Sequence, residues 1–412
     1  MKKICLCLFT FLFMITLVGC KRCNKNNNTV KLTLWGAVEH HDMLSDMVNS
    51  FKKEFETDDI KFDIRIDAVS EADAFTQMQK DVSAGADVYA FPHDQLANLV
   101  RIGGIAAIGG DNLKKIRDEN TTVSLDAGKA GNYYYGYPLS ADNGYFLYYD
   151  SSKISKDDTL TLDSLLSACT ASNSKFLYDL DNSWYDAAFF FGAGCSYDVE
   201  YDEAGTTETK ITCNFNNENG LIAGRAMINL ASHSAFLNGG DDELKAGFAD
   251  GSVAAGVSGT WNATAAKNAL KEGYAATKLP SFVVDNKSYQ MSSFSGYKLM
   301  GVNPHSKNLS WAHKLALWLT NEQNQLIRFE KFETGPTNKK VSENAAVKAN
   351  VALSALAMQN EFAKVQQSVP SNYWTAVEAF GTGVVQKEVT SSNLQNKLNQ
   401  MVDLIKSNQT KN

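Results

Sequence analysis

The feature that most constrains the fold is a regular change of hydrophobic period between residues 31 and 101. Segments in which polar and apolar residues alternate, as in strands, are each followed by a segment with apolar residues at helical spacing. The predicted order is strand 31–35, helix 42–55, strand 62–66, helix 74–82, strand 86–91 and helix 94–101. This order is typical of a parallel sheet with covering helices, so the predicted fold class is α/β.

Two loops of this first part have the position of a ligand site. In open parallel sheets, ligands bind outside the carboxyl ends of the strands. The loops Gly36–His40 and Pro92–Asp94 follow the first and third predicted strands, and both are rich in polar groups.

The rest of the chain continues the same style less regularly. Helices are predicted at 162–171, 183–191, 219–231, 262–271 and 311–320, with strands at 253–258 and 297–303 and a mostly helical last seventy residues. A chain of 412 residues is long for one hydrophobic core. No internal repeat and no long low-complexity linker separates two halves, which favours two lobes joined by several short crossings.

Composition and motifs exclude several classes of function. The net charge is −7 and no basic stripe occurs, which argues against a nucleic acid partner. The sequence contains no G-x-S-x-G, H-E-x-x-H or Walker-type motif. We therefore expect no catalytic residues, no cofactor and no enzymatic activity.

Two polar clusters leave a chemical alternative open. Glu39-His40-His41-Asp42 contains ligand types suited to zinc or manganese. Because adjacent side chains rarely point to one place, we interpret it as a polar loop in which Asp42 caps the next helix, and expect no metal.

The pair His93-Asp94 could be half of a catalytic triad, but the sequence nominates no nucleophile. Asp94 could equally cap the helix that follows it.

The N-terminus has the pattern of an export signal. Lys2 and Lys3 precede an apolar stretch, Ile4–Val18, which is shorter than the ~20 residues of a membrane-spanning helix. The following Gly19-Cys20 resembles the bacterial lipobox, in which the cysteine becomes the acylated N-terminus. We expect residues 1–19 to be a signal peptide; a plain secretory signal or an uncleaved anchor is the alternative.

After Cys20, a polar segment without periodicity predicts a flexible tether over residues 20–30. Cys20 and Cys23 form a C-x-x-C, but an acylated Cys20 cannot act as a thiolate. The three later cysteines allow at most one disulfide among themselves; we interpret them as buried apolar residues. They are Cys169, Cys195 and Cys213.

Aromatic residues are abundant, with 22 Phe, 16 Tyr and 6 Trp. Three clusters are flanked by polar and turn residues: Trp184-Tyr185, Trp261 and Tyr373-Trp374. A sugar ring offers an apolar C–H face that stacks on aromatic rings and hydroxyls that bind carboxylates and amides. From the residues alone, ligand stacking and packing at helix starts are equally good interpretations.

From residue 31 to about 405 the chain resembles the extracellular solute-binding proteins of carbohydrate importers, of the maltose/maltodextrin-binding type. Seven segments carry the resemblance in the family's order: KLTLWGA with the helix ending FKKEF, ADVYAFPHDQLANLVRIGGIAAI, YGYPLSADNGYFLYYD, FADGSVAAGVSGTWN, SFSGYKLMGVNPHSKN, WAHKLALWLTNEQNQLIRF and VPSNYWTAV.

The resemblance implies a type II periplasmic-binding-protein fold, with two α/β lobes and a ligand cleft between them. One lobe would comprise residues 31–140 and 286–335, and the other residues 141–285 and 336–408. Closure around the ligand would be a hinge motion. The closed protein, a monomer anchored by lipid at the outer face of the cell membrane, would deliver an oligosaccharide to an ATP-driven permease.

The resemblance also assigns ligand-binding residues: Glu39, His40, Phe91, Asp94, Asp142, Trp184, Trp261, Tyr373 and Trp374. The sequence departs from the family pattern at Gln95, His40 and Asn182, which replace an arginine, a lysine and a glutamate. These departures leave the aromatic residues in place and change the polar rim, so a maltodextrin-like glycan is the expected ligand.

Three alternatives stay open at this point. The protein could be a sugar sensor that reports to a membrane receptor, or a binder of another small solute with the same fold. A surface glycosidase would need two carboxylates about 5–10 Å apart, for which Asp94 and Asp142 are candidates.

Overall fold

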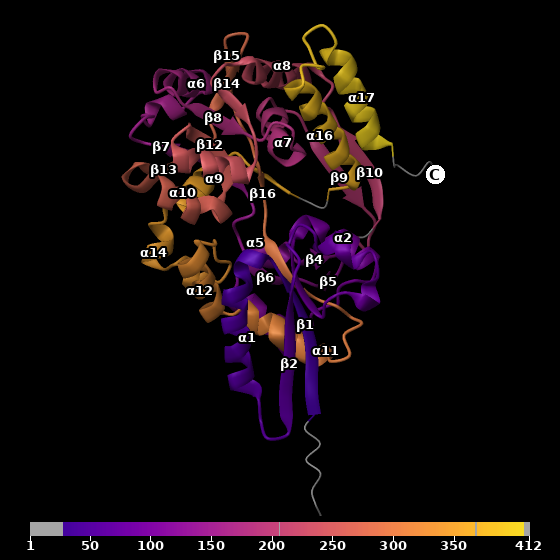
Figure 1. Ribbon diagram of the computed structural model, residues 1–412. Coiled ribbons are helices and arrows are strands. Elements are labelled where there is room, and N and C mark those ends of the chain that lie inside the picture. Colours follow the sequence, from indigo (N-terminus) through magenta and orange to yellow (C-terminus); the bar gives the residue numbers. More distant parts are fainter. Residues whose placement is uncertain (1–27, 206, 367–368, 408–412) are drawn as a thin grey trace, which may run out of the picture.

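The computed structural model describes residues 28–205, 207–366 and 369–407. The predicted signal peptide, Cys20 and most of the predicted tether lie outside these residues. Two lobes are built around two separate five-stranded sheets, one below the other in Figure 1. The lobe that contains the first strand is called the N lobe below, and the other the C lobe.

The sheet of the N lobe has the order β2-β1-β3-β17-β6. Its strands are β1 (Asn28–Gly36), β2 (Ile60–Ala68), β3 (Val88–Pro92), β17 (Lys298–Val302) and β6 (Tyr137–Ser140). The first three are parallel, and β17 runs antiparallel to both of its neighbours. The carboxyl end of β3 therefore lies beside the start of β17, with Pro92 opposite Lys298.

Helices cover this sheet because each has one apolar face. Helix α1 (His41–Phe55) buries Met43, Met47 and Phe51, and α11 (Leu309–Leu319) buries Leu315 and Leu319 in the same core. The remaining helices of the lobe are α2 (Ala74–Met78), α3 (Leu96–Arg101), α4 (Gly110–Glu119), α5 (Thr122–Asp126), α12 (Glu322–Phe332), α13 (Lys339–Ser342) and α14 (Ala345–Lys348).

The sheet of the C lobe has the order β11-β8-β12-β7-β13. Its strands are β11 (Phe236–Asn238), β8 (Lys175–Tyr178), β12 (Val253–Gly259), β7 (Tyr145–Asp150) and β13 (Tyr274–Thr277). Strand β12 is buried at every position, as expected for a strand covered on both faces.

The helices and small sheets of the C lobe surround this strand. The helices are α6 (Leu162–Ala171), α7 (Ser183–Gly192), α8 (Glu218–Ser232), α9 (Asp241–Asp250), α10 (Ala263–Leu270), α15 (Val351–Asn360), α16 (Ser371–Val385) and α17 (Leu394–Lys406). Two-stranded pairs are β9 (Tyr197–Tyr201) with β10 (Glu208–Cys213), β14 (Ser281–Val284) with β15 (Lys287–Gln290), and β16 (Phe294–Ser295) with β18 (Lys364–Val365); in the N lobe, β4 (Lys129–Ala130) pairs with β5 (Tyr133–Tyr134).

The predicted α/β class is confirmed, but several boundaries differ. Strand β1 begins at Asn28, inside the segment expected to be a tether. The helix predicted over 74–82 ends at Met78, because the Asp81 side chain accepts a hydrogen bond from the Ser83 backbone and starts a separate turn.

The second and third crossings between the lobes also lie further along the sequence than expected. The β14–β15 hairpin packs in the C-lobe core through Phe282 and Tyr289, so the second crossing follows residue 290 rather than 285. Helices α13 and α14 pack on Phe329 of α12 through Val341 and Val347. The third crossing therefore lies near residue 350 rather than 335.

The predicted buried state of Cys169, Cys195 and Cys213 is confirmed, and all three are free thiols. Across the described residues, no helix is both long enough and apolar enough to span a membrane.

Candidate functional site

A cavity of about 850 Å³ lies between the two lobes and is partly open to solvent. The N lobe contributes Ser70, Glu71, Ala72, Phe75, Thr76, Gln79, Pro92, Asp94, Gln95, Asn98, Arg101 and Lys298. The C lobe and the crossings contribute Asn143, Trp184, Glu208, Trp261, Gln366, Val369, Pro370, Ser371 and Trp374. Polar side chains thus come mainly from one lobe and tryptophans only from the other.

Asp94 reaches the cavity because β3 ends at Pro92 and the chain turns through a short 3-10 helix, His93–Gln95. Its carboxyl is 7% exposed, and its Oδ1 has no hydrogen-bond partner. Burial raises the pKa of Asp94 to about 7, opposed in part by hydrogen bonding with the Gln366 side chain. Asp94 does not cap α3, whose N-cap is Gln95. The Oδ1 atom is enclosed in this structure, and a ligand hydroxyl would supply the hydrogen-bond partner that it lacks.

His93, the other member of the pair, does not line the cavity. Its Nδ1 accepts a hydrogen bond of 3.2 Å from the Tyr297 backbone N–H. Burial lowers the pKa of His93 to about 4, so the ring is neutral near neutral pH.

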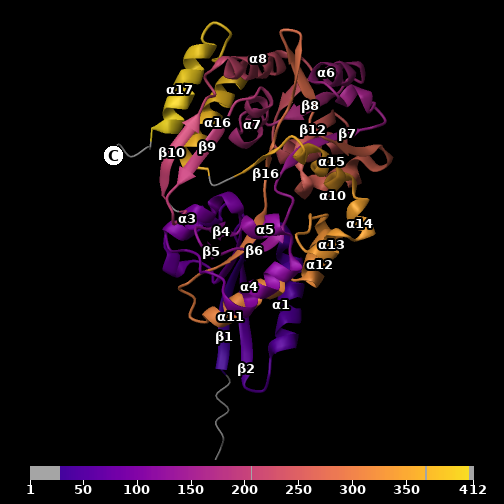
Figure 2. The same ribbon diagram turned by 180° about the vertical axis from the view of Figure 1, so that it is seen from behind.

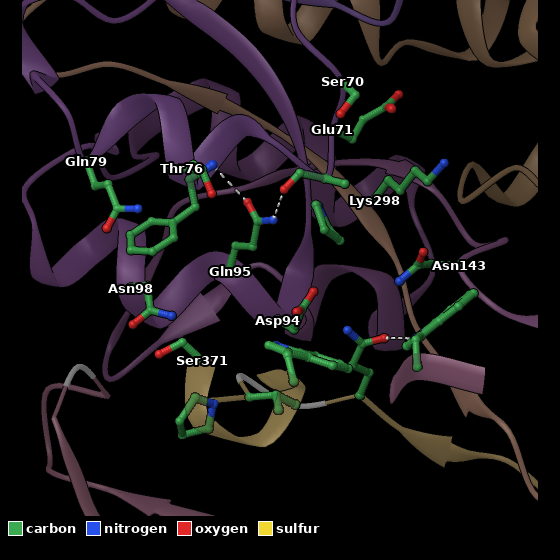
Figure 3. Close-up of a pocket in the computed structure, with 18 of the residues that line it drawn as sticks. Ser70, Glu71, Thr76, Gln79, Asp94, Gln95, Asn98, Asn143, Lys298 and Ser371 are labelled. Carbon is green, nitrogen blue, oxygen red and sulfur yellow. Dashed lines mark hydrogen bonds between the residues drawn. The ribbon is translucent and has the colours of Figure 1, made fainter. Parts of the chain in front are cut away.

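Gln95, which stands where the resemblance has an arginine, braces a loop. Its Oε1 accepts from the Phe75 backbone N–H at 3.1 Å, and its Nε2 donates to the Ala72 carbonyl at 2.7 Å (Figure 3). These two bonds fix the polar segment that starts at Ser70 against the end of β3. Gln95 therefore shapes the cavity wall as well as lining it.

Three tryptophans form the wall on the C-lobe side. Trp184 lies in the first turn of α7, Trp261 follows β12, and Trp374 lies in the first turn of α16. The rings of Trp184 and Trp261 have centroids 5.8 Å apart at 37°. Trp261 is 38% exposed and Trp184 and Trp374 are half-buried, so all three present ring surface to the cavity.

Each indole of the Trp184–Trp261 pair is held by a hydrogen bond. The Nε1 of Trp184 donates to Oε1 of Gln366 at 2.8 Å, and the Nε1 of Trp261 donates to Oδ2 of Asp241 at 2.7 Å. A ring fixed at its polar edge loses little freedom when a ligand stacks on its face.

Phe91 and Tyr373 are fully buried and do not line the cavity. Phe91 packs in an N-lobe core cluster beside Tyr89, and Tyr373 packs in the C-lobe core. Tyr373 meets its neighbour Trp374 edge to face, with centroids 5.0 Å apart at 89°. Successive residues of a helix point about 100° apart, so only one of the two can face the cavity.

A cluster of charges lies at the hinge end of the cavity. The Glu71 and Lys298 side chains line the cavity, and Arg328 lies buried behind them. Burial opposes the charge of Glu71, but Lys298 and then His40 outweigh it and hold the pKa of Glu71 below its usual value. Burial likewise opposes the charge of Lys298, but Glu71 and Asp142 keep its pKa above the usual value.

His40 and Asp142 belong to this cluster without lining the cavity. His40 Nδ1 lies 3.7 Å from Oε1 of Glu71; burial, its largest influence, lowers the pKa of His40. Asp142, 4% exposed, accepts hydrogen bonds through Oδ2 from Thr260 Oγ1 at 3.0 Å and from the Gly335 backbone at 3.2 Å. Asp142 lies in the first crossing, and its carboxylate therefore links that crossing to Thr260 of the C lobe and to Gly335, which follows α12.

Glu39 is exposed, outside the cavity lining, and Asp42 lies in the first turn of α1 without capping it. His41 contacts the Gly36 carbonyl at 3.2 Å, whereas His40 points to Glu71. Within residues 28–205, 207–366 and 369–407, no group of three or more His, Cys, Asp or Glu is placed to hold a metal ion.

Sequence reasoning missed Glu71, Lys298, Asn143 and Gln366, all in the cavity lining. Lys298 could have been found, because it begins a strand that runs antiparallel to β3 and so starts at the carboxyl edge of the sheet. Glu71 follows the next parallel strand at the same edge. No sequence pattern indicated Gln366, because its place in the cavity depends on the path of the chain after the third crossing.

The chain is similar to known proteins over most of its length. The family profile described as "Bacterial extracellular solute-binding protein" matches residues 46–355. A galactooligosaccharide-binding protein of Bacillus subtilis (strain 168) is 27% identical over 362 residues, which cover 85% of this chain and 83% of that protein.

Solved structures share the fold. A structure solved with acarbose is 28% identical, with a TM-score of 0.82, and the match covers 92% of this chain and 99% of that one. A Thermus thermophilus maltotriose binding protein bound with maltotriose has a TM-score of 0.78 at 19% identity, covering 91% and 99%. A maltodextrin binding protein from L. casei BL23 has a TM-score of 0.76 at 22% identity, covering 92% and 100%. These likenesses confirm the two-lobed fold.

Proposed function

Because the chain belongs to the bacterial extracellular solute-binding proteins, we propose that it captures an oligosaccharide between its lobes for import by a membrane permease. In this proposal the protein binds and delivers the sugar without changing it. The cavity, and not an exposed surface, is the ligand site.

The observation that carries the proposal is the division of the cavity into an aromatic and a polar wall. Trp184, Trp261 and Trp374 stand on the C-lobe side, and Asp94 stands on the N-lobe side with an unpartnered oxygen. A sugar ring needs this arrangement, since its C–H face stacks on an indole while its hydroxyls donate to carboxylates and amides.

The volume and shape favour more than one sugar unit. A cavity of about 850 Å³ is large among small-molecule sites, and its three tryptophans come from separate helix starts. The relative from Bacillus subtilis is a galactooligosaccharide-binding protein, and the neighbours of known structure include maltotriose and maltodextrin binding proteins. We propose a maltodextrin-like oligosaccharide as the ligand, with galacto-oligosaccharides as the second class to test.

We propose direct binding for Asp94 and the three tryptophans. Phe91 and Tyr373 would support these residues from behind, because neither has exposed surface in the cavity. Asp142, His40 and Glu39 would act at the hinge end, where Asp142 links the crossing to Gly335 and Thr260.

We further propose that Cys20 carries the lipid anchor and that residues 1–19 are removed as a signal peptide. Two or more acyl chains hold a protein stably at a membrane. Replacing Cys20→Ala should release the protein from the membrane or block its maturation. A mature protein that stays in the membrane without acyl mass on Cys20 would contradict the anchor.

The proposed function is tested by a thermal-shift screen of the protein against maltodextrins, galacto-oligosaccharides and monosaccharides. A ligand at one hundred times its Kd stabilises the fold by about 2.7 kcal/mol. We expect a higher melting temperature with oligosaccharides of at least one class. If no oligosaccharide shifts it, or if incubation releases shorter sugars, the proposal is wrong.

A further inference from the structure

The β9–β10 hairpin extends from the C lobe to the N lobe. In Figures 1 and 2 its two strands leave the lobe that contains α16 and α17 and end beside the helices of the other lobe. The turn that follows β9 includes Glu203, Ala204 and Gly205, and this turn meets the short β4–β5 hairpin at Ala130 and Gly131. The two lobes therefore touch through two turns that are far apart in the sequence.

The contact is made backbone to backbone. A Cβ atom on Gly131 would lie 3.0 Å from the Glu203 carbonyl oxygen and 3.1 Å from that of Ala204. A Cβ atom on Gly205 would lie 2.9 Å from the Gly131 nitrogen. A side chain at either glycine would push the facing backbone away, and because the contact is between backbones it cannot adapt by changing a rotamer.

This contact stands at one end of the cavity. Glu208, the first residue after the turn and the partner of Tyr201, lines the cavity, as does Arg101 of α3, whose Nη2 donates to Asn98 Oδ1 at 2.6 Å. Asn98 and Gln79 lie at one side of the close-up, and Lys298 and Asn143 lie at the opposite side (Figure 3). Because α3 packs against β4, the two turns meet at the Asn98 end, away from the hinge charges.

We propose that the β9–β10 hairpin is an interlobe clasp that closes the Asn98 end of the cavity and so limits the length of the oligosaccharide that is bound. This inference rests on the proposed function. A longer chain that leaves the cavity at this end must separate Gly131 from Gly205. The clasp therefore selects by repulsion, which is an effective source of specificity when attractive contacts are shared between ligands.

The test compares ligand-length profiles by calorimetry on the full-length protein, with maltose to maltoheptaose and a galacto-oligosaccharide ladder as probes. In the wild type, affinity should fall by about tenfold, or about 1.4 kcal/mol, once the chain is long enough to reach the clasp. In a short-hairpin variant, residues 202–207 are replaced by Asn-Gly, which joins paired strands in a tight turn. That variant should bind long and short members with similar affinity.

Two point variants make the comparison specific, because asparagine tolerates a positive φ. Gly131→Asn introduces a side chain into the contact at a φ of +55°, and should also relieve the discrimination. Gly110→Asn is the matched control: its φ is +55° as well, and a Cβ there has nothing within 4 Å. The control should keep the wild-type profile.

The outcomes separate this proposal from the proposed function. If the wild type binds oligosaccharides but the short-hairpin and Gly131→Asn profiles match those of the wild type, the clasp does not limit length. The same conclusion follows if wild-type affinity never falls along the ladder. If the wild type binds no member of either ladder, the proposed function itself is overturned, and this inference with it.

Discussion

The indole nitrogen of Trp184 donates a 2.8 Å hydrogen bond to the side-chain oxygen of Gln366, a residue 182 positions further along the chain. Gln366 is buried, and its side chain also hydrogen-bonds Asp94 of the opposite lobe. One amide therefore holds the edge of an aromatic platform and contacts the carboxyl that faces it. This arrangement links the two walls of the cavity before any ligand enters.

A double-mutant cycle measures this link. Trp184→Phe keeps an aromatic ring and removes the N–H donor, and Gln366→Leu removes the acceptor. We expect each change to weaken oligosaccharide binding, with a coupling energy of about 0.5–1.5 kcal/mol, the usual net value of a hydrogen bond. Additive effects in calorimetry would show that the bond does not position the Trp184 ring.

The Asp94 carboxyl should make ligand binding depend on pH. Its pKa of about 7 lies above the ordinary 3.8, so the ligand-free protein keeps an extra proton in this range, and the stability that Asp94 contributes falls as pH rises through it. Ligand hydroxyls that donate to the carboxylate favour the ionised form. Binding near neutral pH should therefore release protons, and affinity should rise with pH up to about 7.

Calorimetry in two buffers of different ionisation enthalpy counts these protons. Asp94→Asn should abolish the release and weaken binding by about 1.5–3 kcal/mol, the range for hydrogen bonds to a charged group. If the wild type takes up protons on binding, or if the variant releases as many protons as the wild type, Asp94 does not bind the ligand.

Trp374 and Tyr373 should respond in opposite ways to truncation. Tyr373 is fully buried, so Tyr373→Ala should cost about 3–5 kcal/mol of unfolding free energy. Trp374 faces the cavity, so Trp374→Ala should cost considerably less stability and reduce oligosaccharide affinity more than tenfold, by about 1.4 kcal/mol or more. Urea unfolding and calorimetry of both variants check this. A Trp374→Ala protein with lost stability and unchanged affinity would make Trp374 a core residue.

Glu71 should stabilise the hinge end of the N lobe through its charge. Its lowered pKa means that the stabilisation is present above the ordinary value of 4.5 and is lost as pH falls below it. Glu71→Gln leaves Lys298 and Arg328 with less compensation, and should cost about 1–3 kcal/mol at neutral pH. Urea unfolding should show this difference shrinking in acid. A pH-independent difference would indicate lost packing instead.

The order of strands and helices in the N-terminal part of the fold could be predicted because each element has a hydrophobic pattern within its own residues. The strands and helices between residues 31 and 101 each repeat their own hydrophobic period, and the carboxyl-edge rule then placed Asp94 in the cavity. Phe91, which the resemblance assigned to the ligand, instead lies within β3 and packs in an N-lobe core cluster. The end of a strand can be predicted from sequence. Whether a side chain inside the strand faces a core or the ligand depends on the elements that pack on the two faces of the sheet.

The rest of the site depends on contacts between distant segments. Gln366 reaches the cavity only after the chain has crossed between the lobes, and it has no sequence neighbour that indicates this. The predicted boundary at residue 285 divided the β14–β15 hairpin and gave β15 to the wrong lobe, because the crossing follows residue 290, after a turn at Asp285-Asn286 that the hydrophobic pattern does not reveal. The family resemblance therefore predicted the order of the elements correctly, but it placed the second and third crossings too early in the sequence.

Oligosaccharide binding between the lobes is tested most directly by titrating the full-length protein with maltodextrins and galacto-oligosaccharides in a calorimeter, beside the Trp374→Ala variant. We expect saturable binding of at least one oligosaccharide at a single site, with affinity strongly reduced in the variant. Absence of binding by the wild type, or equal affinity in the two proteins, would contradict an oligosaccharide site between the lobes.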